Sequence, residues 1–337
     1  MIRHSRVTLK HRAEGLLNEP LADRDVESVP IPFTADEDQL YDDLDDLLGR
    51  PMEAHGTRRG AGFVLTVYRR RLTSSWEAIR RTLERRLTHE QQLVLDADDL
   101  LDEVEEEEGL ETAEGSTVDD AAAVPLDSAD LAAIRSYVER ISRLATDSKL
   151  DRLLQHVDEA RSTGQSLIVF TQFTDTPDYL RDRLRPAYAA NLATFTGGGG
   201  RIWDDVEGRW LEISKRDLVE AIRAGRITIL LATDAASEGL NLQACSYLVN
   251  FDMPWNPMRA EQRIGRIDRL GRHRPVVTVK NYFVPDTVEE SVYAALGARI
   301  DDFSDLLGNL QPILGSHRGG IQGHLSRAPL GAQTRRG

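Results

Sequence analysis

The feature that most constrains the fold of this chain is a regular alternation of short apolar runs with amphipathic stretches, which begins after Gly164. The runs are rich in Val, Ile and Leu and are continuously apolar, as expected of strands that are covered on both faces. The expected strands are residues 167–170, 192–195, 227–232, 247–251 and 276–283. The expected helices are residues 177–184, 214–223, 257–270 and 287–307. This alternation predicts an α/β fold in which helices wrap a parallel sheet.

Upstream of this alternation the pattern is mostly helical. Thr34 and Glu37 form a capping box at the start of a helix expected over residues 34–48. Further helices are expected over residues 74–95, 128–144 and 147–161. One strand is indicated before them, because Val29, Ile31 and Phe33 alternate with other residues.

The acids of the chain are unevenly spread, and their distribution suggests the domain organisation. The formal net charge is -14, and many of the acids lie between Asp96 and Asp120. Blocks of like charge repel one another and seldom pack, so we expect a flexible acidic segment over about 96–127. We therefore expect a helical region at residues 1–127, a sheet-containing domain at 128–315 and a disordered tail at 316–337.

Composition excludes several classes of protein. No apolar run is long enough to span a membrane, and the first fifteen residues are too polar for a secretion signal, so we expect no membrane partner and a cytoplasmic location. The single cysteine, Cys245, has no thiol partner, and we expect no metal site. All but four of the 42 basic residues are arginine. Both a GC-rich genome and a salt-adapted acidic protein remain open as explanations of this composition.

Four polar loops follow the expected strands, each at the point where a strand ends. Their sequences are TQF at 171–173, TGGGG at 196–200, TDAASEGLNLQ at 233–243 and DMPWNP at 252–257. The carboxyl ends of parallel strands meet at one edge of a sheet, and ligands bind there. Hydroxyls, glycines and backbone amides at such an edge suit phosphate groups.

An arginine segment, residues 256–274, follows the last of these loops. It holds six arginines and two acids, Glu261 and Asp268. In a helix Gln262, Arg266 and Arg269 share one face, and guanidinium forks suit phosphate oxygens. A solvated basic helix is the alternative, and it stays open on this segment alone.

The other loop features each have an ordinary structural alternative. The glycine run at 197–200 suits a flexible turn, because no lysine and helix follow it as in a phosphate-binding loop. Asp234 and Glu238 suit helix caps, and Trp255 suits a packing residue. No single one of these features decides the function.

Taken in order, the motifs resemble those of a known family. IVFTQFTDT, FTGGGG, ILLATDAASEGLNLQ, NFDMPWNP and EQRIGRIDRLGR are similar to the motifs of the second RecA-like lobe of superfamily-two helicases. The Swi/Snf-related branch is the most similar, and within it the HepA/RapA-like ATPases. The resemblance covers about residues 147–314, and the segments MIRHSR and LTSSWEAIRR resemble the region between the two lobes. It implies a RecA-like fold preceded by an inter-lobe helical region.

The resemblance also implies roles for particular residues. Arg266 and Arg269 correspond to arginine fingers, and Gln262 to a residue that couples the nucleotide to lobe closure. The residues implied near ATP are Asp234, Glu238, Gly239 and Arg263, with Asp234 holding its loop or an arginine. The residues implied to face nucleic-acid phosphates are Thr171, Gln172, Thr196, Gly197 and Thr233. Arg272 and Arg263 depart from the Swi/Snf pattern, which usually has glutamine and alanine there.

The family's first lobe has no counterpart in these 337 residues. The sequence has no G-x-x-x-x-G-K-[ST] motif, and none of its four lysines follows a glycine. We therefore expect the second lobe of an ATP-dependent helicase or translocase, whose first lobe and Mg²⁺ are supplied in cis by a longer protein or in trans. The expected nucleic acid is DNA in preference to RNA. A non-catalytic nucleic-acid- or protein-binding module, or a remnant of a split helicase gene, is the alternative.

Overall fold

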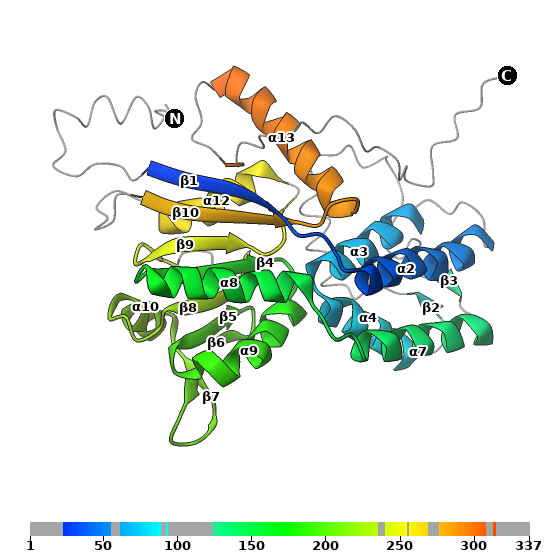
Figure 1. Cartoon of the computed structure of the whole chain (residues 1–337), viewed down its shortest axis with the longest axis horizontal. Coiled ribbons are helices and arrows are strands. Elements are labelled where there is room, and N and C mark those ends of the chain that lie inside the picture. The colour runs from blue at the N-terminus through cyan, green and yellow to red at the C-terminus, as the bar shows by residue number, and fades with distance from the viewer. Residues whose placement is uncertain are drawn as a thin grey trace.

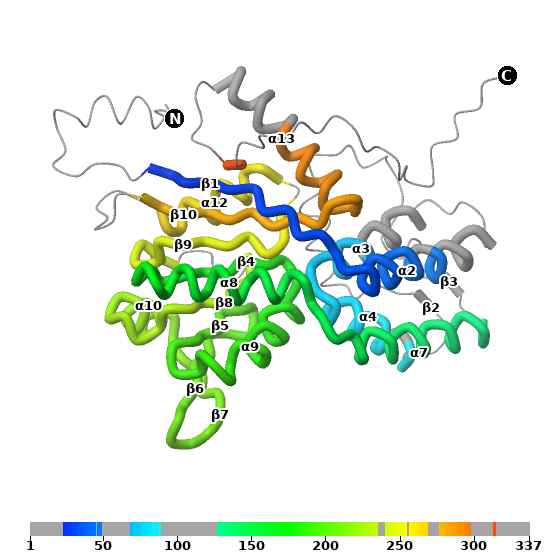
Figure 2. Tube along the Cα trace, in the orientation of Figure 1, coloured from blue at the N-terminus to red at the C-terminus, as the bar shows by residue number. Residues whose placement is uncertain are grey.

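The computed structural model describes most of the chain between Asp23 and Leu314. The described residues are 23–54, 61–88, 92–93, 124–125, 127–234, 240–254, 256–268, 276–307 and 313–314 (Figure 1), and Figure 2 traces the path of the chain. The acidic segment and the C-terminal tail expected from the sequence lie almost wholly outside these ranges. None of the described helices is long and apolar enough to cross a membrane.

An eight-stranded sheet forms the centre of the molecule, in the order β1-β10-β9-β4-β8-β5-β6-β7 (Figure 1). The five strands expected from the apolar runs are all present and mutually parallel. They are β4 (Ser166–Thr171), β5 (Leu192–Thr196), β8 (Ile229–Thr233), β9 (Cys245–Asn250) and β10 (Val276–Phe283). The expectation of a RecA-like parallel sheet covered by helices is confirmed.

The structure adds a hairpin that the sequence analysis did not expect. β6 (Gly199–Asp204) pairs antiparallel with both β5 and β7 (Arg209–Ile213). The glycine run therefore continues from a turn into a strand. Gly200 is required there, because a Cβ atom would lie 2.8 Å from the carbonyl oxygen of Ile213.

Helices cover both faces of the sheet. On one face α8 (Ser148–Ser162) and α9 (Asp175–Tyr188) pack their apolar sides on β4, β8 and β9. The other face is covered by α10 (Lys215–Arg223), α12 (Pro257–Ile267) and α13 (Val288–Leu307). Burial on both faces explains why the central strands are apolar without alternation.

The strand β1 (Asp23–Pro30) lies at the edge of the sheet, parallel to β10 (Figure 1). Its sequence alternates, so Val26 packs on the core that contains α12 and α13, whereas Val29 packs on the core that contains α8 and α9. On the α12 side Arg24 lies two residues before Val26. This edge strand thereby brings the start of the described chain beside the arginine segment.

A separate helical unit packs at one end of the sheet. It consists of α2 (Ala35–Ala54), α3 (Ala61–Ser74), α4 (Trp76–Thr88) and α7 (Ser128–Ser142), which share their own apolar core. A short two-stranded ribbon, β2 (Gln92–Leu93) with β3 (Val124–Pro125), accompanies it. The packing places α7 with these helices and β1 with the sheet, and the domain boundary at residues 127–128 stays a prediction.

Buried charged residues join the helical unit to the sheet. Glu37 accepts hydrogen bonds from Trp76 Nε1 at 3.1 Å and from the backbone nitrogen of Ser148 at 2.9 Å. Lys149 Nζ donates to the Thr73 carbonyl at 2.7 Å and to Glu289 at 2.9 Å. Burial raises the pKa of Glu289 to about 7, and the charge of Lys149 opposes this rise. The unit is thus held to the sheet by charge-assisted hydrogen bonds.

Candidate functional site

The four polar loops expected to meet at one sheet edge do so. The strands β4, β5, β8 and β9 run parallel, and each loop leaves the carboxyl end of its strand. The helix α12 begins directly after the fourth loop, with Asn256 capping it and Pro257 at its first turn. The arginine segment therefore starts at this edge, which makes it the candidate site.

Asp252, in the fourth loop, holds the first loop in place. One carboxylate oxygen accepts hydrogen bonds from Thr171 Oγ1 at 2.5 Å and from Ser74 Oγ at 2.7 Å. The other accepts from the backbone nitrogen of Gln172 at 2.9 Å. The Asp252 side chain is buried, so these bonds form away from water and fix the loop backbone.

The five residues implied to face nucleic acid differ in their exposure. Thr171 and Thr233 are buried, Gln172 and Thr196 are half-buried, and Gly197 is exposed. Gln172 also donates from Nε2 to the Met253 carbonyl at 2.9 Å and accepts a hydrogen bond from Arg70. The edge thus presents Gln172, Thr196 and Gly197 outward, with the two threonines behind them.

Arg263 is buried in α12 and is held by partners outside that helix. Its guanidinium donates to both carboxylate oxygens of Asp234, at 2.6 and 2.5 Å. It also donates to Asn250 Oδ1 at 3.0 Å and to the Asp252 carbonyl at 2.7 Å. Asp234 therefore holds an arginine, and Arg263 ties the third loop to the fourth.

Arg266 lies on the outward side of α12. It is half-buried, and no described residue forms a hydrogen bond or an ion pair with its guanidinium. Gln262, one turn earlier, is exposed and has no described side-chain partner. A guanidinium in this position can donate to a phosphate. Glu238, Gly239, Arg269 and Arg272 lie outside the described residues.

Arg24 is a site residue that the sequence analysis missed. Its side chain, only 1% exposed, reaches from β1 to both acids of the arginine segment. It donates to Glu261 at 2.7 Å through both terminal nitrogens and to Asp268 at 2.6 Å through Nε. No local signal marks Arg24, because its partners lie more than 230 residues away.

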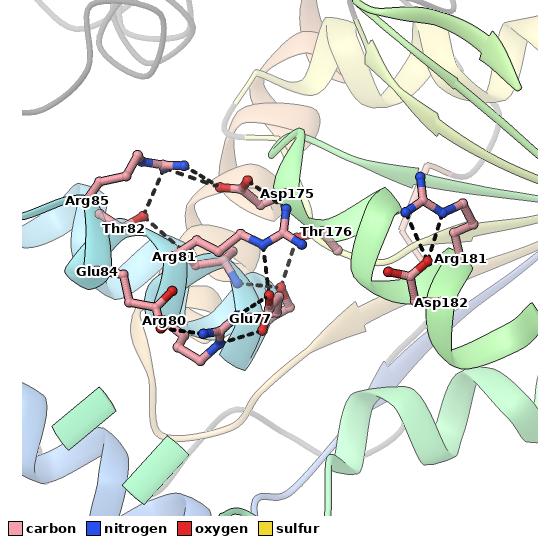
Figure 3. Close-up of polar contacts among 12 residues, drawn as sticks. Glu77, Arg80, Arg81, Thr82, Glu84, Arg85, Asp175, Thr176, Arg181 and Asp182 are labelled. Atoms are coloured by element: carbon pink, nitrogen blue, oxygen red, sulfur yellow. Dashed lines mark hydrogen bonds and ion pairs between the residues drawn. The ribbon is translucent and has the colours of Figure 1, made fainter. Parts of the chain in front are cut away.

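The junction of α3 and α4 is a second region that the sequence analysis missed. Ser74 reaches Asp252, and Arg70 reaches Gln172, so this junction contacts the loop edge directly. Beside it, Arg81 and Arg85 of α4 converge on Asp175 in the first turn of α9 (Figure 3). Arg71 of α3 donates to the same carboxylate at 3.3 Å. Within the described ranges, no group of three or more His, Cys, Asp or Glu residues is arranged to hold a metal ion.

Comparison with known families identifies the domain that carries this edge. Residues 148–271 match the helicase conserved C-terminal domain. The chain contains a helicase C-terminal domain. The matched range of this helicase lobe includes all four loops and most of the arginine segment. The match confirms that the motifs resemble those of a helicase C-terminal lobe.

Two relatives of this chain are longer proteins that match it over part of their length. An uncharacterized ATP-dependent helicase, YqhH of Bacillus subtilis, is 32% identical over 294 residues, which cover 86% of this chain and 42% of the relative. The RNA polymerase-associated protein RapA of Vibrio parahaemolyticus is 33% identical over 133 residues, which cover 39% of this chain and 12% of the relative. The chain thus spans less than half the length of either relative.

Solved structures with similarity to this chain include part of an ATPase domain. The C-terminal part of the Fun30 ATPase domain aligns with a TM-score of 0.46 at 16% identity, covering 82% of this chain and 90% of that structure.

Proposed function

We propose that this protein is the second motor lobe of an ATP-dependent helicase or translocase that acts on nucleic acid. In this role the arginine segment supplies Arg266 and Arg269 to the phosphates of ATP, and Gln262 couples the nucleotide to lobe closure. The first lobe supplies the phosphate-binding loop and Mg²⁺, either in a longer protein or on another polypeptide.

The observation that carries this proposal is the contrast between two arginines of α12. Arg263 is saturated by Asp234, Asn250 and a backbone carbonyl, and its role is to shape the loop edge. Arg266 faces outward, with no described partner for its guanidinium. A guanidinium stabilises the charge that develops on a phosphoryl group in transfer, and Arg266 would break no described bond when it binds a phosphate.

ATP would bind where the first lobe meets the loop edge. None of the four lysines of the chain follows a glycine, so the phosphates need a loop lysine from the first lobe. Within this chain Asp234 and Arg263 would hold the loop that contains Glu238 and Gly239. The magnesium ion, when bound, would neutralise charge on the phosphates.

Nucleic acid would pass over the first two loops of the edge. Gln172, Thr196 and Gly197 are positioned for direct contact with backbone phosphates, because they are exposed or half-buried. The buried Thr171 and Thr233 would support the loops from behind, Thr171 through its bond to Asp252. We propose DNA rather than RNA as the nucleic acid, because the motifs resemble those of the Swi/Snf-related branch. We also propose a cytoplasmic location.

The test is ATP turnover by the chain combined with a first lobe, supplied in trans or by fusion. Arg266→Ala and Arg269→Ala are each expected to lower kcat by about 10³-fold or more, as for other arginine fingers. Nucleic-acid affinity should stay within about twofold of the unaltered protein. Arg209→Ala, in the exposed β7 strand, is the matched control and should leave turnover unchanged. Equal losses of turnover and nucleic-acid binding would contradict the finger assignment.

The alternative role is a binding module without catalysis. It would be favoured if the chain binds nucleic acid but no first lobe gives turnover. The RNA polymerase association in the name of one relative makes a protein partner a further possibility for such a module.

A further inference from the structure

The two acids of the arginine segment occupy one side of α12. Glu261 and Asp268 are seven residues apart, which is about two turns, so they project from the same side of the helix. Asp268 is also the residue at the C-terminal cap of α12. A carboxylate there has the wrong sign for the helix dipole, whose C-terminal end is partly negative. A cation close to Asp268 is therefore needed to offset the repulsion between its carboxylate and the helix end.

Arg24 supplies that cation from a different part of the chain. All three of its guanidinium nitrogens are used, two on Glu261 and one on Asp268. The Arg24 side chain is 1% exposed, Asp268 is fully buried and Glu261 is 33% exposed. A planar fork that binds carboxylates two turns apart restrains rotation of α12 about its own axis as well as its position.

The opposite flank of α12 is held in the same manner. Arg263 projects from that flank into Asp234, Asn250 and the Asp252 carbonyl. Between the two flanks lies the apolar side of the helix, with Ala260, Ile264 and Ile267 in the core. Taking about 100° per residue, the remaining outward side carries Gln262 and Arg266.

We propose that Arg24 is a positioning residue for the arginine segment. It holds the two acids of the segment and thereby fixes the angle at which α12 presents Gln262 and Arg266. Arg24 acts through the helix and touches no substrate. Its importance for turnover rests on the proposed function above, whereas its hold on α12 does not.

The first test measures hydrogen exchange in the chain alone. Arg24→Met removes the charge and keeps an apolar side chain of similar reach. The amides of the last two turns of α12 are expected to exchange at least tenfold faster, while those of α8 keep their rate. Arg71→Met is the matched control, because Arg71 is an equally buried arginine whose ion pair is with Asp175 of α9. A uniform rise across the protein, or no change in α12, would overturn the proposal.

Arg24→Met leaves Glu261 and Asp268 without their guanidinium partner, which could itself destabilise the fold. A second variant therefore removes the charges of these two acids as well. The triple variant Arg24→Met/Glu261→Gln/Asp268→Asn removes all three charges, so it keeps the fold even if the single variant does not fold. It should still show faster exchange confined to α12, because neutral amides bind no fixed guanidinium fork. Arg24→Lys keeps the charge but not the fork, and it should give an intermediate rate. An unchanged α12 in the triple variant would also overturn the proposal.

The second test measures turnover with a first lobe present. The triple variant is expected to lower kcat at least tenfold, with KM for ATP and the affinity for nucleic acid within about twofold of the unaltered protein. Arg140→Met, which alters an exposed pair in the helical unit, should leave all three values unchanged. Faster exchange in α12 with normal kcat would refute the positioning role. If the unaltered protein itself shows no turnover, the proposed function fails, and the exchange experiment still decides whether Arg24 holds α12.

Discussion

Two arginine-rich helices of this protein, α4 and α12, have similar compositions and different chemical environments. In α4 the arginines pair within the helix and with its neighbour: Arg80 binds Glu77 and Glu84, and Arg81 binds Glu77 and Asp175 (Figure 3). In α12 the acids of the segment are both bound by Arg24 of β1. The positive charge of α4 is therefore largely balanced locally, whereas Arg266 of α12 keeps an outward guanidinium.

The difference shows that the charge of a helix does not by itself predict a phosphate-binding surface. The partners of the individual charged side chains have to be known as well, including the cations that bind the acids of the helix. In α4 they are bound by the helix's own arginines, so its charge needs no ligand to balance it. In α12 they are bound by an arginine from outside, and Arg266 lies on another side of the helix with no described side-chain partner.

The largest effect on stability is expected at the buried guanidinium of α12. Arg263→Met leaves Asp234 without its bidentate partner and should lower the free energy of unfolding by about 3–5 kcal/mol. Urea denaturation followed by circular dichroism measures this change. Arg263→Met with Asp234→Asn should recover part of the loss. A loss below about 1 kcal/mol would show that the pair is no more important than those of α4.

An intermediate effect is expected for the buried arginine beside α4. Arg71 donates to Thr82 Oγ1 at 2.8 Å and to Asp175 at 3.3 Å. Arg71→Met should cost about 1–3 kcal/mol, because Asp175 retains Arg81 and Arg85 as partners. The same denaturation experiment tests it. If Arg71→Met lowers the free energy of unfolding as much as Arg263→Met does, the additional arginine partners of Asp175 do not reduce the cost of losing one of them.

A small, salt-sensitive effect is expected within α4 itself. Arg80 is 25% exposed and pairs with two acids of its own helix, so Arg80→Ala should cost under about 1 kcal/mol at 0.1 M NaCl. At 1 M NaCl the Debye length falls to about 3 Å, and most of the electrostatic part should vanish. The buried Arg263 pair should keep its contribution under the same conditions. Thermal melts at the two salt concentrations make the comparison.

The smallest effect concerns the response of α4 to acid. The pKa of Glu77 is lowered by hydrogen bonds from Arg80 and Arg81, which outweigh the opposing effect of burial. A lowered folded-state pKa adds stability above the unfolded value of about 4.5, and this stability is lost as pH falls below it. The difference in stability between the unaltered protein and Glu77→Gln should therefore be largest at neutral pH and disappear in acid. A constant difference from pH 7 to pH 3 would contradict the shift.

Much of the fold could be predicted from the sequence. The central strands are buried on both faces, so each appears in the sequence as a continuous apolar run. The exceptions have physical causes. α3 contains Phe63, Val64, Val67 and Tyr68, which are weak helix formers, and it is stabilised by packing in the helical unit. The β6–β7 hairpin begins at glycines, which suit a turn as well as a tightly packed strand.

The candidate site was predictable only in outline. Motif order placed the loops at one edge, and parallel strands bring them together. The roles of Arg263 and Arg24 depend on partners 29 and more than 230 residues away, and spacing within a helix carries no information about such pairs. For the same reason the sequence could not separate the saturated Arg263 from the outward Arg266.

The pairing of β1 with β10 has a consequence for the synthesis of the protein. β1 ends at Pro30 and its partner begins at Val276, so on a ribosome adding about 5–20 residues per second β1 waits roughly 10–50 s for the strand it pairs with. During that interval its hydrogen-bonding edge is open to other chains. The charged residues Asp23, Arg24, Asp25 and Glu27 oppose such pairing. Arg24 would thus protect the nascent chain from aggregation before its buried partners have been made.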